Sequence, residues 1–120
     1  MMKEEQLQVF HSYQNMHKHY LKNALKLLVK RDYRKTSEML LGAVSQAIKA
    51  SAIEKGIKIR HHKHFKKYIE ELTKTREDER LINLFEDIEI LHQNFYDEII
   101  PNRKFIKYFE KVMNFLTILK

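Results

Sequence analysis

Two stretches of the sequence hold side chains that could do chemistry, and the first is the run KIRHHKHFKK at residues 58–67. Five cations in ten residues, placed where a loop meets a helix, create a strong local positive field, and exposed NH groups at a helix start add to it. The run therefore predicts a phosphate-binding surface, with a solvated basic loop as the structural alternative. The residues predicted to bind phosphate are Lys58, Arg60, His61, Lys63, His64, Lys66 and Lys67, and His62 lies among them.

The second stretch surrounds His92, whose neighbours one helical turn away are Ile88, Phe95 and Tyr96. These neighbours predict a partly apolar cleft in which a neutral imidazole could act as a general base, with Tyr96 beside the ligand. The alternative is a core histidine whose ring is hydrogen-bonded to a tyrosine or a backbone carbonyl. A ribonuclease built from these stretches would use His92 as the base and Arg60 or His64 to hold phosphate.

Composition removes several other chemistries. The chain has no cysteine, which excludes a disulfide framework, a thiolate nucleophile and cysteine-ligated zinc. Glu89-x-x-His92 has the spacing of one half of a di-iron site, but the sequence contains no second such pair. Glycine-rich phosphate loops are also missing. We therefore expect neither a metal nor a cofactor.

Charge and hydropathy indicate the partner class and the compartment. Twenty-three Lys and Arg against sixteen Asp and Glu give a formal charge of +7, which favours an anionic partner and nucleic acid first. The first ten residues, MMKEEQLQVF, lack the apolar region of a secretion signal, and no run approaches the roughly 18 apolar residues of a membrane span. We expect a cytoplasmic protein without a membrane partner.

The element that must position His92 is the stretch LINLFEDIEILHQNFYDEI at residues 81–99. Its apolar residues recur at steps of three and four, which predicts one helix about five turns long with His92 inside its apolar stripe. Such a face has to be covered by other helices. The stripe consists of Leu81, Leu84, Phe85, Ile88, Leu91, Phe95 and Ile99.

The remaining periodic segments supply those partners. Two glycines and one proline provide too little turn chemistry for a β-sandwich or barrel, so we predict an all-α fold. Asp32 is the expected cap between the first two helices, Gly56 fits the end of the second, and Pro101 marks the last break. The expected helices are Lys3–Lys30, Tyr33–Lys55, Lys63–Thr75 and Asn102–Leu119. Together with residues 81–99 they predict one domain over residues 1–120, an up-and-down bundle of four long helices plus one short helix.

The second predicted helix has a face of small residues. Ala43, Ala47 and Ala50 are spaced to lie together, and Gly42 beside them costs roughly 1 kcal/mol relative to alanine unless a partner helix crosses there. Close packing of this kind could serve the bundle or a dimer, and we expect it inside the bundle. The broad apolar stripes separately predict a homodimer.

With these elements placed, the sequence resembles the PaREP1 group of archaeal proteins, within the broader HEPN-like class of helical bundles. The resemblance rests on Asp32-Tyr33, on SEMLLGAVSQAIKASAIEKG at 37–56, on HFKKYIEEL at 64–72 and on ILHQNFYDEIIP at 90–101. It implies a HEPN-like bundle, often dimeric. Members of that class bind nucleotides or RNA, partner with nucleotidyltransferases, or cleave RNA without metal.

One departure from the class decides between binding and cleavage. RNA-cleaving members carry an arginine followed after four to six residues by the histidine that His92 would match. The positions at this spacing before His92 hold Phe85, Glu86 and Asp87, so the arginine is missing there. Arg60 and His64 have only three residues between them and lie in another part of the chain. We therefore predict a non-catalytic nucleotide- or RNA-binding module. Its alternatives are a metal-independent ribonuclease and a helical protein-interaction or scaffolding unit.

Overall fold

The computed structural model describes residues 2–120, and within that range every regular element is a helix and there is no strand. The all-α prediction is confirmed. There are six α-helices and one short 3-10 helix: α1 (Glu4–Val29), α2 (Tyr33–Glu54), α3 (Lys63–Arg76), α4 (Arg80–Ile88), α5 (Ile90–Asp97), η1 (Asn102–Lys104) and α6 (Phe105–Leu119). None of these helices is long and apolar enough to cross a membrane.

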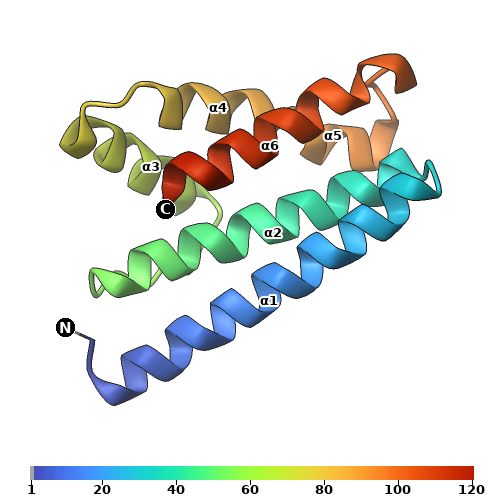
Figure 1. Cartoon of the computed structure of the whole chain (residues 1–120). Helices are drawn as coiled ribbons and strands as arrows, with labels where there is room; N and C mark the ends of the chain where they lie inside the picture. The colour runs from blue at the N-terminus through green and yellow to red at the C-terminus, as the bar shows by residue number, and fades with distance from the viewer. Residues whose placement is uncertain (1) are drawn as a thin grey trace.

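Helix α2 is the shared element of the fold. α1 runs back along one side of it, while α5 and α6 pack on its other side (Figure 1). α4 packs against both α6 and α3, so the later helices form a second layer. Because its faces are covered from two directions, α2 contributes more buried residues than any other helix. They are Thr36, Ser37, Leu40, Ala43, Val44, Ile48, Ala50, Ala52 and Ile53.

The contact between α1 and α2 depends on small residues, as predicted. Tyr20 of α1 lies directly over Gly42, where an added Cβ would be 2.7 Å from the Tyr20 ring. One turn earlier in α1, His17 Nδ1 is 2.7 Å from the carbonyl oxygen of Ala43. A side chain at Gly42 or a larger one at Ala43 would push α1 outward, so the small-residue face serves packing within the chain.

The predicted boundaries between α1, α2 and the connection that follows are confirmed. Asp32 caps α2, since its Oδ1 accepts a hydrogen bond from the backbone NH of Lys35 at 3.2 Å. Gly56, with φ of 76°, occupies the left-handed conformation after α2 that glycine adopts at little cost.

Residues 81–99 do not form the single helix that we predicted, because the helix breaks at Glu89 into α4 and α5. At the break, Glu89 NH donates to the carbonyl of Glu86 and His92 NH to that of Glu89, both three residues back. In such a 3-10 turn each residue is rotated by about 120° around the helix axis, compared with about 100° in an α-helix. The residues after the break therefore face the core at earlier positions than they would in a regular helix. Leu91 is buried as the predicted stripe requires, but the residue buried beside it is Asn94, where a regular helix would have buried His92 and Phe95.

Asn94 holds α5 in this orientation through a buried polar network. Its Nδ2 donates to Ser37 Oγ of α2 at 3.0 Å, and its Oδ1 accepts from the backbone NH of Ile100 at 2.7 Å. Ser37 Oγ in turn donates to the carbonyl of Tyr33. Leaving one such buried partner unsatisfied costs about 1–3 kcal/mol, so this network anchors both α5 and the turn after it.

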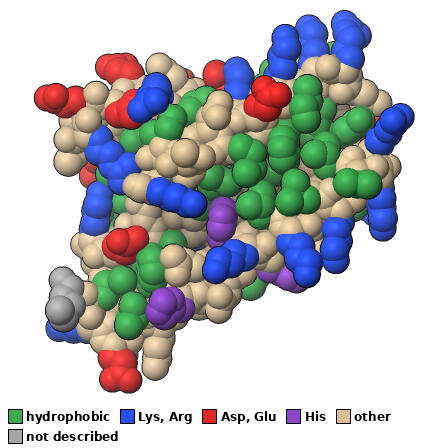
Figure 2. Space-filling view, viewed as in Figure 1, with side chains coloured by type: hydrophobic (Ala, Val, Ile, Leu, Met, Phe, Trp, Pro, Cys, Tyr) green, Lys and Arg blue, Asp and Glu red, His purple; other side chains and the backbone are tan. Residues whose placement is uncertain are grey.

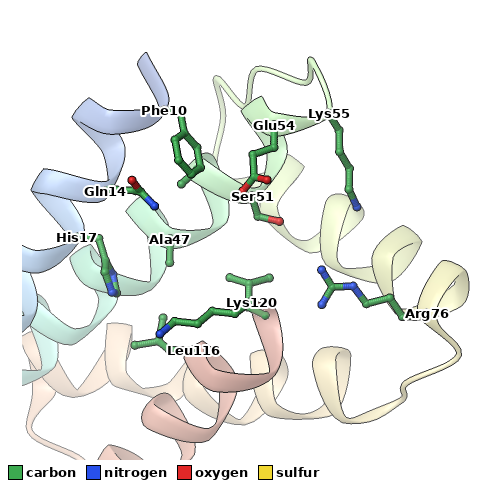
Figure 3. Close-up of a pocket in the computed structure, with 12 residues that line it drawn as sticks. Phe10, Gln14, His17, Ala47, Ser51, Glu54, Lys55, Arg76, Leu116 and Lys120 are labelled. Carbon is green, nitrogen blue, oxygen red and sulfur yellow. The ribbon is translucent and has the colours of Figure 1, made fainter. Parts of the chain in front are cut away.

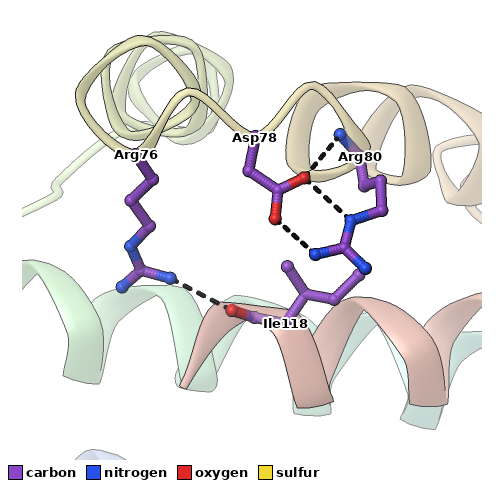
Figure 4. Close-up of polar contacts among 4 residues, drawn as sticks. All are labelled: Arg76, Asp78, Arg80 and Ile118. Atoms are coloured by element: carbon purple, nitrogen blue, oxygen red, sulfur yellow. Dashed lines mark hydrogen bonds and ion pairs between the residues drawn. The ribbon is translucent and has the colours of Figure 1, made fainter.

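An ion pair between Asp78 and Arg80 stabilises the turn between α3 and α4. Asp78 accepts from the backbone NH, Nε and Nη2 of Arg80, the last at 2.7 Å (Figure 4). The Arg80 guanidinium therefore holds the pKa of the Asp78 carboxyl below its usual value. Nearby, Arg76 Nη1 donates to the carbonyl of Ile118 at 3.0 Å, which ties the end of α3 to the last turn of α6.

The close approach of α1 to α2 leads to a stability prediction. Helix propensity alone would make Gly42→Ala stabilising by about 1 kcal/mol, but its Cβ would meet the rigid Tyr20 ring. Because overpacking typically costs about 1–3 kcal/mol, we expect a net destabilisation of about 1 kcal/mol, measured by urea unfolding. Ser45→Ala in the same helix is the control. A Gly42→Ala protein more stable than the parent would contradict the observed packing.

Candidate nucleic-acid interface

The basic junction, residues 58–67, forms an exposed surface that is anchored from beneath. Ile59 is buried and holds the connection to the core, whereas Lys58 and Arg60 on either side of it are exposed. In α3, Phe65 and Tyr68 face the core. Lys63, Lys66 and Lys67 lie on the exposed side of that helix. The alternation of apolar anchors and cations thus presents all five charges to solvent.

In the part of the chain that the structure describes, none of these five cations has a carboxylate partner. Over residues 2–120, the ion pairs involve Lys35, His62, Arg80 and Lys111, and none involves a cation of the basic junction. The helix α3 also has no acidic residue in its first turn and no side-chain cap. An incoming phosphate would therefore meet uncompensated positive charge.

The fold brings α5 against this junction through a line of three rings. The His62 and His92 rings are stacked with centroids 5.9 Å apart, and the His92 and Tyr96 rings meet edge to face at 5.6 Å. All three side chains are exposed, Tyr96 to 62%. The ring line, which we define as His62, His92 and Tyr96, connects the positive surface to an exposed aromatic side chain.

The position of His92 corrects the sequence-based expectation. We predicted that His92 would lie in a partly apolar cleft within a buried stripe, but its side chain is exposed. The cause is the break at Glu89, which rotates α5 so that Leu91 and Asn94 face the core. His92 is therefore neither a core histidine nor a base enclosed in a cleft.

The proposed catalytic constellation is only partly assembled. His64 has its ring 5.4 Å from that of His61, and among the described residues neither His64 nor Arg60 has a recorded side-chain interaction with His92. The histidine that does reach His92 is His62, which we had placed in the basic run without assigning it a binding role. Tyr96, selected as a ligand-binding residue, does lie beside His92.

Two residues at the interface were missed by sequence reasoning. Glu89 Oε2 lies 3.6 Å from His62 Nε2 and orients that ring from the break between α4 and α5. Asn94 sets the rotation of α5 from the buried side. A polar residue at position 94, inside an otherwise apolar period, was the available signal for a buried hydrogen bond. No sequence signal could show that residue 62 would meet residue 92.

The arrangement is suited to binding a phosphate backbone and bases together. Exposed cations attract phosphates without reading sequence, and exposed rings stack on bases. A metal role finds no such support, because no cluster of three His, Asp or Glu side chains suitable for an ion occurs within residues 2–120.

Comparison with known proteins gives one match. The model of the archaeal PaREP1/PaREP8 family matches residues 12–116, which is most of the chain. No curated protein and no solved structure matches.

Proposed function

We propose that this chain, which belongs to the archaeal PaREP1/PaREP8 family, is a non-catalytic module that binds single-stranded RNA across the basic junction and the ring line. The observation that carries the proposal is the meeting of five unpaired cations with three exposed rings, supplied by segments thirty residues apart in the sequence. The resemblance to HEPN-like bundles, a class with nucleotide- and RNA-binding members, supports the same function.

The basic junction and the ring line would contact different parts of the RNA. Lys58, Arg60 and the lysines of α3 neutralise phosphates, and this interaction is independent of sequence and sensitive to salt. His92 and Tyr96 offer π faces on which unpaired bases stack, worth about 1–3 kcal/mol per base in other single-strand binders. Paired bases in a duplex would not reach these rings, so the proposal commits to single strands.

The geometry favours binding over cleavage. A ribonuclease that used His92 as base would need Arg60 or His64 near the same phosphate. His92 instead contacts His62 and Tyr96 on an open surface that excludes little water. Enclosure and positioned phosphate donors are both needed for efficient transfer of the 2′-hydroxyl proton, and this surface offers little of either.

The cations are tested by a salt series. The logarithm of affinity for a labelled single-stranded RNA should fall linearly with the logarithm of salt concentration. Replacing both Arg60 and Lys63 with alanine should weaken binding to all sequences and reduce the slope by roughly one to two units. The control replaces Lys18 and Lys22, two exposed cations of α1, and so removes the same charge. If both double variants lost the same RNA affinity, the effect would come from net charge alone, and the basic junction would not be the binding surface.

The rings are tested at constant salt. Because His92 is exposed, we now expect His92→Ala to weaken binding, and Tyr96→Ala to weaken it by about fivefold to a hundredfold, the range of one stacked base. Neither change should alter the salt slope, since neither removes a phosphate contact. Gln93→Ala, also exposed on α5, is the control. Cleavage of the RNA by the parent protein, lost in His92→Ala, would instead establish the ribonuclease.

We also propose that the module is a homodimer, joined through an apolar face. Figure 2 shows hydrophobic side chains gathered across α6 and α2 and bordered by Lys and Arg. α1 and α6 both pack on α2, and each exposes a large apolar side chain: Leu25 of α1 is 45% exposed and Ile106 of α6 is 49% exposed. Partly buried Leu21, Phe109 and Met113 continue this face by helical spacing. An apolar face bordered by charged side chains is typical of a protein interface.

The dimer is tested by light scattering. We expect Leu25→Glu and Ile106→Glu each to shift the protein toward the 14.6 kDa monomer, because a charge would be buried without a partner. Ile57→Glu is the matched control, since Ile57 is 42% exposed in the connection after α2. A parent protein that scatters as a monomer at high concentration would rule out the dimer.

A further inference from the structure

A cavity of about 490 Å³ lies at the end of the molecule where α1 begins and α6 ends. It opens between these two helices above α2, because both pack on α2 and the alanines beneath them are too small to fill the gap. Ala47 and Ala50 form the floor, and Phe10, Leu116 and Leu119 form apolar walls (Figure 3). This volume is within the range of small-ligand sites, and such a lining favours an apolar body.

The rim of the cavity is positively charged. Lys55 extends over it from the end of α2 and Arg76 from the end of α3, whereas the Lys120 side chain points toward the opposite wall, where His17 lies (Figure 3). Glu54 is the one carboxylate among the lining side chains, so three positive charges less one negative leave +2. Between residues 2 and 120, no ion pair involves any of these four side chains.

Two of the cations are held in place without being neutralised. Arg76 uses Nη1 to donate to the carbonyl of Ile118 at 3.0 Å, which leaves its other NH groups free to bind an anion. The Lys55 ammonium is 5.6 Å from the centre of the Tyr68 ring, whose hydroxyl is in turn 2.7 Å from Ser51 Oγ. Such positioning lowers the entropic cost of ordering the side chains on binding.

His17 adds an oriented polar group to the wall opposite the rim. Its Nδ1 is 2.7 Å from the carbonyl oxygen of Ala43, and because a carbonyl only accepts, Nδ1 carries the hydrogen. In the neutral ring, Nε2 is then left as an acceptor. Gln14, one turn away, lines the same wall. These groups suit a ligand with polar atoms on its body.

We propose that this cavity binds a small amphipathic anion, with its apolar body over Ala47 and Ala50 and its carboxylate or phosphate group at Lys55 and Arg76. The cavity shares no lining residue with the basic junction or the ring line. Lys63 and Arg76 stand at opposite ends of α3, and 13 residues of helix span about 20 Å. The proposal therefore stands or falls independently of RNA binding.

The ligand class is tested by calorimetric titration of the whole chain with decanoate, decyl phosphate and decanol below their micellar concentrations. The three probes share one apolar body and differ in the head group. We expect at least one of the two anions to bind at a single site, at least tenfold more tightly than decanol, and the stronger anion identifies the head group. Equal binding of decanol, or no binding of either anion, would overturn the proposal.

Variants locate the binding. Ala47→Leu fills the floor and should abolish binding of the anion, while Lys55→Met and Arg76→Gln should each weaken it roughly tenfold, the worth of one charge-assisted hydrogen bond. Lys74→Ala removes an exposed charge from the same end of α3 without touching the cavity and should leave binding unchanged. Urea unfolding confirms that each variant is folded. Anion binding that survives both Ala47→Leu and Lys55→Met would place the anion elsewhere and refute the assignment.

Discussion

The fold depends on how closely α1 can approach α2. Tyr20 rests on the bare backbone at Gly42, and His17 reaches the carbonyl of Ala43, so α1 is held by one narrow seam of α2. Since α5 and α6 cover the other side of the same helix, α2 is buried from two directions while α1 keeps an open flank. That open flank produces both the apolar face between α1 and α6 and the cavity at its end. A bulkier α2 would have separated the helices and removed the floor on which both features depend.

The second constraint is the break at Glu89. Helix breaks usually occur at proline or glycine, and neither is present here. The turn is instead tightened where Asn94 bonds Ser37 and Ile100, which favours a rotated α5. The rotation replaces the regular α-helical hydrogen bonds of one turn, and the buried hydrogen bonds of Asn94 offset the free-energy cost of that change. Its consequence on the surface is that His92 and Tyr96 point outward, beside His62 of the basic junction. A buried amide thus sets the geometry of an exposed interface.

The two candidate sites differ in shape as their ligands require. The basic junction is exposed and its cations are unpaired, which suits a long, flexible polyanion that is held by many weak contacts. The cavity above Ala47 and Ala50 is concave, with an apolar floor and charge only at the rim, which suits a small ligand with one charged end. Both draw on the surplus of +7, but the cavity places its charge beside an apolar floor, whereas the basic junction places its charge on an exposed surface.

The sequence by itself determined the all-α fold, the positions of α1, α2, α3 and α6 to within a few residues, and the close helix contact at Gly42. Each of these follows from local information: apolar spacing, capping at Asp32, and the steric freedom of glycine. It also located the basic junction, because a charge run remains on the surface in nearly any fold. Only the tertiary structure decided the break at Glu89, the exposure of His92 and its contact with His62. These outcomes depend on Asn94 finding Ser37, 57 residues away, and a long-range hydrogen bond leaves no periodic trace in the sequence. The cavity has the same origin, since it is the space left between two helices that share a third.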